Sequence, residues 1–91
     1  MVLKTSSQFS IDLKKVKDLS LQDKVKHVLK SLKTAKNVND VPHFRKISGN
    51  NKAYKMGIGF YYLVGIITSE QEITLMRLLH RDEVLQAIKN T

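Results

Sequence analysis

The stretch ISGNNKAYKMGIGFYYLVGIITSEQEITLMRLLHRDEVL, residues 47–85, decides the fold. Its runs of β-branched and aromatic residues are separated by glycines near position 59 and by the polar residues 69–72. Runs of this kind, bounded by turn residues, are typical of neighbouring strands in an antiparallel sheet. We expect two strands within Ala53–Ile67, joined by a bend near Gly59, and a last strand at Ile73–Leu79. A shorter strand is expected at His43–Ile47, followed by a turn over residues 48–51.

The residues before this stretch predict an opening strand at Val2–Lys4 and two amphipathic helices. In the first helix, about Ser7–Asp18, apolar residues recur with helical spacing at Phe9, Leu13 and Val16. The second helix extends to about Lys36, and Ser20 is its expected N-cap, with Asp23 three residues later. Its apolar stripe consists of Leu21, Val25, Val28, Leu29 and Leu32.

This order of elements predicts an α+β fold. We expect the N-terminal strand and the α-hairpin to pack on one face of a small antiparallel β-sheet, within a single domain of residues 1–91. A short C-terminal helix is expected after Asp82, with Val84, Leu85 and Ile88 facing inward. The opposite face of the sheet is then free for function.

Alternation along the strands predicts which side chains meet the helices. One set, expected on the open face, is Lys55, Gly57, Gly59 and Tyr61; the set expected against the helices is Tyr54, Met56, Ile58 and Phe60. In the last strand, Ile73, Leu75, Arg77 and Leu79 are expected to share one face, and Thr74, Met76, Leu78 and His80 the other. The two glycines either let a ligand approach closely or simply mark a bulge.

Composition restricts the classes of function. The 91 residues include 16 Lys and Arg against 8 Asp and Glu, a net charge of +8, with a pI near 9.9. This balance favours a nucleic-acid or acidic protein partner, although surplus lysine also serves solubility. There is no cysteine, which excludes disulfides and thiol catalysis, and the three scattered histidines do not predict a metal site.

The sequence also predicts where the protein acts. No segment has the composition of a signal peptide or a membrane span, so a cytoplasmic location is expected. The helical lysines surround an apolar stripe that the core requires, and we therefore expect no membrane partner. No dinucleotide fingerprint is present, and no cofactor is expected.

Basic residues at the ends of the predicted strands are the candidates for chemistry. His80 and Arg81 form the best pair, because histidine transfers protons near neutral pH and arginine binds phosphate bidentately. Arg77, among leucines, is either a partly buried structural charge or an anion contact. Residues 43–46 combine aromatic and basic side chains, and Tyr61 and Tyr62 are able to stack on bases.

From these residues, the chain resembles toxins of the RelE/ParE superfamily of toxin–antitoxin systems. Family members typically show KL-x-G…YR-x-R-x-G-x-YR followed by R-x-x-HR-x-x-x-Y, and this chain has KISG…AYKMGIGFYY and ITLMRLLHRDEV. The matching residues are Lys46, Gly49, Tyr54, Gly59, Tyr61, Arg77, His80 and Arg81.

The resemblance implies a toxin that is neutralised by an acidic or amphipathic antitoxin segment. The RelE branch cuts mRNA on the ribosome through attack of a 2′-hydroxyl on the adjacent phosphate, whereas the ParE branch poisons DNA gyrase. If the chain resembles the RelE branch, which we favour, the expected catalytic residues are Lys55, His80 and Arg81. The expected RNA-binding residues are Arg45, Lys46, Lys52, Tyr61 and Arg77.

The chain departs from the family pattern at several positions of its working surface. Gly57 and Tyr62 stand where family members usually carry arginine, Lys55 replaces another arginine, and Leu85 replaces an aromatic residue. Loss of one transition-state donor costs roughly 10²–10³ in rate. A weakened nuclease, or a non-catalytic protein that only binds gyrase or an antitoxin, is the alternative expectation.

Overall fold

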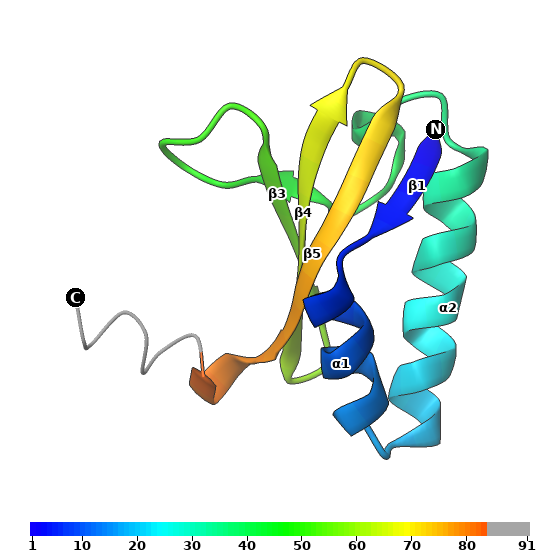
Figure 1. The fold of residues 1–91 in the computed structure, drawn as a ribbon, viewed down its shortest axis with the longest axis vertical. Coiled ribbons are helices and arrows are strands. Elements are labelled where there is room, and N and C mark those ends of the chain that lie inside the picture. Colours follow the sequence, from blue (N-terminus) through cyan, green and yellow to red (C-terminus); the bar gives the residue numbers. More distant parts are fainter. Residues whose placement is uncertain (84–91) are drawn as a thin grey trace.

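The computed structural model describes residues 1–83 and shows an α+β fold (Figure 1). Strand β1 (Val2–Thr5) is followed by helices α1 (Ser7–Lys15) and α2 (Leu19–Thr34) and by the short 3-10 helix η1 (Val38–Asp40). The remaining strands are β2 (Arg45–Lys46), β3 (Ala53–Ile58), β4 (Tyr61–Ser69) and β5 (Glu72–His80). The predicted fold class is therefore confirmed, whereas the terminal helix expected around Val84, Leu85 and Ile88 lies outside the described residues.

The five strands form one sheet in the order β1-β5-β4-β3-β2. β2 to β5 pair antiparallel with their neighbours, as expected, but β1 runs parallel to β5. No hairpin joins these two strands, so no local turn signal in the sequence reports their relative direction. The sheet is consequently mixed.

Both helices begin at side-chain caps. The Ser6 hydroxyl accepts a hydrogen bond from the Phe9 N–H at the start of α1, at 3.0 Å. At the start of α2, the Asp18 carboxylate accepts from the N–H groups of Ser20 and Leu21, at 2.9 and 3.3 Å. The prediction of Ser20 as the N-cap was wrong, because Asp18 lies two residues earlier and satisfies two free N–H groups of the first turn.

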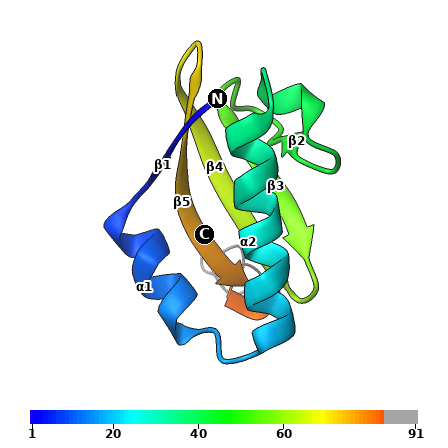
Figure 2. The same cartoon turned by 90° about the vertical axis from the view of Figure 1, so that its right-hand side faces the viewer.

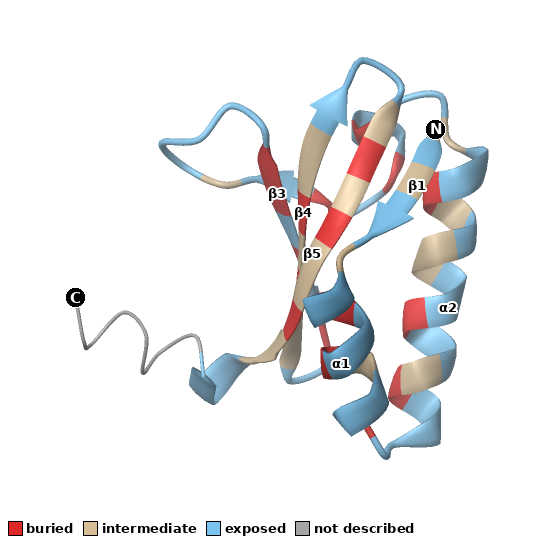
Figure 3. Cartoon of the chain, viewed as in Figure 1, coloured by how far each residue is buried: buried red, intermediate tan, exposed pale blue. Residues whose placement is uncertain are grey.

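The core lies between α2 and one face of the sheet. Figure 2 shows α2 in front of that face, with α1 beside the β1–β5 edge. Val25 and Leu32 of α2 and Leu63 of β4 are completely buried there, and the predicted Val28 and Leu29 are half-buried against them. Buried positions alternate with more exposed ones along the strands (Figure 3). We call the side of the sheet away from α2 the open face.

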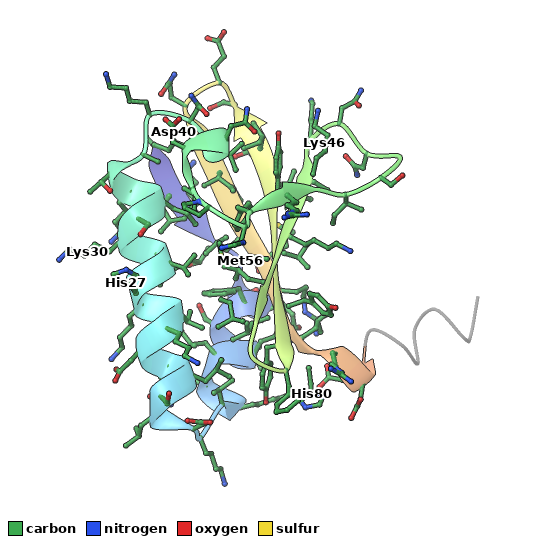
Figure 4. All side chains as sticks on the ribbon, turned by 180° about the vertical axis from the view of Figure 1, so that it is seen from behind. His27, Lys30, Asp40, Lys46, Met56 and His80 are labelled. Atoms are coloured by element: carbon green, nitrogen blue, oxygen red, sulfur yellow. The ribbon has the colours of Figure 1, made fainter. Side chains whose placement is uncertain are left out.

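The tight turn between β3 and β4 changes the predicted faces. Tyr54, Met56 and Ile58 are buried as expected, and Met56 lies between β3 and α2 in Figure 4. Gly59 adopts a φ of +59°, a left-handed conformation that glycine adopts without strain, and Phe60 is 65% exposed in the turn. The predicted assignments of Phe60 to the core and of Tyr61 to the open face were wrong, because alternation does not continue through a turn.

A bulge in β5 changes the faces a second time. Gly65 pairs with Leu75 and Val64 with Arg77, which leaves Met76 as the extra residue. Leu78 therefore joins Ile73 and Leu75 in the core, while Arg77 moves to the open face. The prediction that Arg77 shares a face with Ile73 and Leu75 was wrong, because one inserted residue reverses the alternation.

The segment before β3 is less regular than predicted. Of the expected strand His43–Ile47, only Arg45 and Lys46 form strand β2, and the Ile47 N–H donates to the Ala53 carbonyl of β3 at 2.8 Å. The strand does not begin at His43, because that residue adopts a left-handed φ of +67°. Phe44 is buried and stacks on Tyr54, with ring centroids 6.0 Å apart. The expected turn follows, with Gly49 at a φ of +82°.

Candidate nucleic-acid interface

Three cationic side chains share one row across the open face. Arg45 of β2 pairs with Lys55 of β3, Lys55 with Val64 of β4, and Val64 with Arg77 of β5. Directly paired residues project on the same side of a sheet, and neighbouring strands lie about 4.8 Å apart. We call Arg45, Lys55 and Arg77 the basic row. Arg45 and Lys55 lie on adjacent strands, and Arg77 lies two strands from Lys55 with Val64 between them.

Arg77 is held at one end of the basic row by the buried Asp12 of α1. Its Nε donates to Asp12 Oδ2 at 2.8 Å and its Nη2 to Oδ1 at 3.3 Å, which makes a bidentate pair. The Asp12 side chain is 5% exposed, whereas that of Arg77 is 42% exposed. The guanidinium is therefore anchored from behind and still reaches solvent.

Asp12 also binds the edge of β5 beyond the end of β1. Its Oδ2 accepts from the Leu78 N–H at 2.9 Å, and the Ser6 hydroxyl donates to the Met76 carbonyl at 2.7 Å. Burial alone would raise the pKa of Asp12, but hydrogen bonds from Arg77, Leu78 and Gln8 outweigh it and lower the pKa below its usual range. The same pairing raises the pKa of Arg77. Asp12 is therefore a fixed negative charge that joins α1 to β5.

Replacing Asp12 with asparagine is expected to lower the free energy of unfolding at neutral pH by about 1–3 kcal/mol, since a buried charged hydrogen-bond acceptor is lost. Because folding lowers the pKa of Asp12, its contribution is complete above the unfolded value of about 4 and disappears as pH falls through the folded value. Urea denaturation of both proteins from pH 7 to pH 2.5 measures this difference, which should shrink in acid. The exposed Asp23→Asn is the matched control, and an equal loss in both variants would contradict this role.

Lys55 and Tyr62 form the centre of the open face. The Lys55 ammonium lies 5.8 Å from the centroid of the Tyr62 ring, within the range of a cation–π contact. Tyr62 pairs directly with Gly57 on one side and with Leu79 on the other. The two positions at which the family arginines are missing, Gly57 and Tyr62, are thus a single cross-strand pair beside Lys55.

His80 and Arg81 lie at the end of the sheet, in a cluster with the β3–β4 turn. The His80 ring stacks on Phe60 at a centroid distance of 6.4 Å and meets Tyr61 edge-on at 5.0 Å. The Arg81 guanidinium lies 5.7 Å from the Phe60 centroid, and the Arg81 N–H donates to the Phe60 carbonyl at 2.7 Å. We call Phe60, Tyr61, His80 and Arg81 the turn cluster.

One nitrogen of His80 is already engaged. The Asp82 N–H donates to Nδ1 at 3.2 Å, and an Asp82 carboxylate oxygen lies 3.5 Å from the same atom.

The residues expected to act together are distributed over different parts of the sheet. Lys55 is on the open face, whereas His80 pairs with Tyr61, which packs on the core side. Lys46 pairs with the buried Tyr54 and shares its face, and Lys52 lies in the turn before β3. Figure 4 shows Lys46 and His80 toward opposite ends of the sheet. Only Arg45, Lys55 and Arg77 of the expected residues share the open-face row.

Some residues of this surface were missed by sequence reasoning. Asp12 received no role from the sequence, although it follows Phe9 by three residues and precedes Val16 by four, which places it on the apolar side of the first helix. Its partner Arg77 lies 65 positions away, and helical spacing carries no information on so distant a contact. Phe60 was assigned to the core because it follows an alternating strand. Its position after Gly59 was the one signal that it occupies a turn.

Within the described residues, no three His, Asp or Glu side chains gather closely enough to hold a metal ion. No helix of residues 1–83 combines the length and hydropathy of a membrane span.

Comparison with solved structures shows which fold this is. The chain superposes on the RelB–RelE antitoxin–toxin complex from Methanococcus jannaschii with a TM-score of 0.80 and 21% identity, over 92% of this chain and 96% of that one. It matches the isolated E. coli RelE toxin with a TM-score of 0.65 and 14% identity, over 96% and 97% of the two chains. For the chromosomal ParDE system of P. aeruginosa the values are 0.57 and 17%, over 88% and 95%.

These comparisons show that the chain has a RelE/ParE-like toxin fold, which the sequence resemblance predicted. At these identities the likeness is one of fold. No protein-family model matches the sequence, and no curated protein sequence matches it significantly.

Proposed function

We propose that this protein is the toxin of a toxin–antitoxin pair and acts as a RelE-like, ribosome-dependent mRNA endoribonuclease. The observation that carries the proposal is the basic row on the open face of the sheet, in a chain whose fold matches RelE along nearly its whole length. Cleavage by an internal 2′-hydroxyl needs little covalent chemistry from the protein. It needs positioned cations to hold the backbone and to stabilise the charge that develops on the phosphate.

The residues have separate roles in this proposal. Lys55 contacts the scissile phosphate, and Arg45 and Arg77 hold the neighbouring phosphates, with Arg77 oriented by Asp12. His80 is the candidate proton-transfer group, and Arg81 beside it is a further phosphate contact. Because Lys55 and His80 project from different faces, they act together only if the RNA bends around the end of the sheet.

The alternative function is a non-catalytic toxin that binds gyrase or retains antitoxin binding alone. The specific observation that favours it is the Gly57–Tyr62 pair, which leaves Lys55 without the cationic neighbours that family members usually carry. With no charge at positions 57 and 62, a phosphate held at Lys55 receives less charge stabilisation in the transition state.

Cleavage of mRNA on purified translating ribosomes, with the RNA ends mapped, distinguishes the two functions. The wild type should cut within codons, and Lys55→Ala should cut at least tenfold more slowly while keeping its fold. Lys30→Ala, on the outer side of α2, is the matched control (Figure 4). Growth arrest by the wild type without any RNA cleavage would replace the nuclease proposal with the binding alternative.

The proposed protein partner is an acidic or amphipathic antitoxin segment. A groove of about 480 Å³ lies between α2 and β3 and is lined with apolar side chains at Val28, Met56 and Ile58, with Asp23, Lys24 and His27 beside them. An amphipathic segment fits such a groove with its apolar side inward and its acidic side on the lysines of α2. Co-expression with the neighbouring reading frame should relieve growth arrest, and the relief should be lost when Val28→Glu is introduced.

Binding to single-stranded RNA is expected to weaken steeply with salt, because each lysine or arginine contact releases a counterion. In a titration from 50 to 300 mM salt, Lys55→Ala should reduce the slope of log K against log salt by about 0.7, the value for one phosphate contact on a single strand. Lys30→Ala should keep the wild-type slope. A salt-independent affinity of the wild type would contradict the role of the basic row.

A further inference from the structure

Phe60 is an exposed aromatic residue that the proposed function does not use. The other two phenylalanines, Phe9 and Phe44, are 2% and 5% exposed, whereas Phe60 is 65% exposed. The packing of the core therefore does not require an aromatic side chain at this position. Phe60 differs from an isolated surface residue because the His80 ring and the Arg81 guanidinium lie against its ring.

The Phe60 ring is held in place although it is exposed. Its carbonyl accepts the Arg81 N–H, which ties the turn to the end of β5, and the His80 ring stacks on it at an interplanar angle of 23°. Tyr61, packed on the core, supports His80 edge-on. A ring that is already ordered loses little conformational entropy on binding, so it makes an efficient platform.

The groups around this ring are those that bind an unpaired nucleotide. Aromatic rings, histidine rings and arginine guanidinium planes stack on bases, and arginine also binds the adjacent phosphate. A hollow of about 200 Å³ lies beside the ring, between Phe60 and the start of α2, and Lys24 lines it. Asp18 lines the same hollow and Asp82 follows Arg81, so an anion is favoured only at the guanidinium itself.

We propose that the turn cluster is a stacking site for one unpaired base of a single-stranded RNA, with Arg81 on the phosphate of that nucleotide. This site deepens the proposed function, because it adds an RNA contact at the end of the sheet, away from the basic row. It recognises a base through its π-face and not through its edge, so it tolerates any sequence. A protein ligand is less suited to it, since charged groups surround the ring.

The test is binding of a fluorescein-labelled ten-nucleotide oligouridine without ribosomes. Phe60→Leu keeps an apolar side chain but removes the stacking surface, and it should weaken binding about 5- to 100-fold, while Phe60→Trp should retain or improve it. The salt slope of Phe60→Leu should equal that of the wild type, because no charge is removed. Arg81→Ala should reduce the slope by about 0.7.

An oligomer with abasic sites is the matched control ligand, since it keeps the phosphates and lacks the bases. The wild type should bind it as weakly as Phe60→Leu binds oligouridine, and Phe60→Leu should not distinguish the two ligands. Equal oligouridine binding by the wild type and Phe60→Leu would overturn the stacking site. So would a Phe60→Leu variant that keeps RNA binding but loses relief by the antitoxin, because Phe60 would then serve a protein contact.

The two proposals fail in different ways. If oligouridine binding depends on Phe60 but ribosomes yield no cleavage, the stacking site stands and the nuclease function fails. If cleavage depends on Lys55 but neither cleavage nor oligouridine binding changes in Phe60→Leu, the nuclease function stands and the stacking site fails. Thermal denaturation of Phe60→Leu should match the wild type, because the ring is exposed.

Discussion

Truncation of Leu63 to alanine is expected to lower the free energy of unfolding by about 2–5 kcal/mol, because it opens a cavity in the centre of the core. Leu63 lies on the middle strand β4 and is completely buried, with 0% of its surface exposed to solvent. It pairs with Met56 and Leu78, which are also buried. Domains of this size are stable by about 5–15 kcal/mol, so the loss is a large fraction of the total. Chemical denaturation with far-UV circular dichroism measures it.

Leu19→Ala is the matched control for this experiment, since Leu19 is 74% exposed at the start of α2. Its free energy of unfolding should change by less than about 0.5 kcal/mol. If the two variants lost similar stability, Leu63 would not lie in the principal core of the folded protein.

Under the proposed nuclease function, the double variant Gly57→Arg, Tyr62→Arg is expected to increase ribosome-dependent cleavage by on the order of 10²-fold. The backbone of Gly57 tolerates a side chain, because a Cβ there would meet only the Tyr62 Cε1 atom within 4 Å, at an ordinary contact distance of 3.8 Å. Both new guanidinium groups would project from the open face beside Lys55. Mapped RNA ends and single-turnover rates measure the gain.

The double variant Gly57→Gln, Tyr62→Gln has polar, flexible but uncharged side chains and serves as the control. Its cleavage rate should not exceed that of the wild type. An equal rate in the arginine and glutamine variants would show that the open face does not stabilise the transition state.

The regular parts of the fold were predictable because they depend on local pattern. Helical spacing at Phe9 and Leu13 and alternation at Tyr54 and Met56 each reflect burial on one side of a single element. These patterns located both helices and the strands of the β3–β4–β5 meander. The parallel direction of β1 was not predictable, since it depends on a strand that lies far along the chain.

The candidate site was predictable in residue type but not in arrangement. The resemblance identified Lys55, Arg77, His80 and Arg81, yet the face of each depends on one turn and one bulge. The Gly59 turn moved Tyr61 to the helix side, and the extra Met76 moved Arg77 to the open face. Each of these features alters a register by one or two residues and leaves little trace in hydrophobic spacing.

The pairing of β1 with β5 has a consequence for the order of folding. Val2 pairs with Glu72, about 70 positions further along the chain, whereas the β3–β4 hairpin joins residues close in sequence. Closing the larger loop costs more entropy, so the hairpin is expected to form early and β1 to join last. In pulse-labelled hydrogen exchange during refolding, the Val2 amide, which donates to the Gln71 carbonyl, should gain protection after the amides of β3 and β4. Weakening β1 should then speed unfolding and leave the refolding rate nearly unchanged.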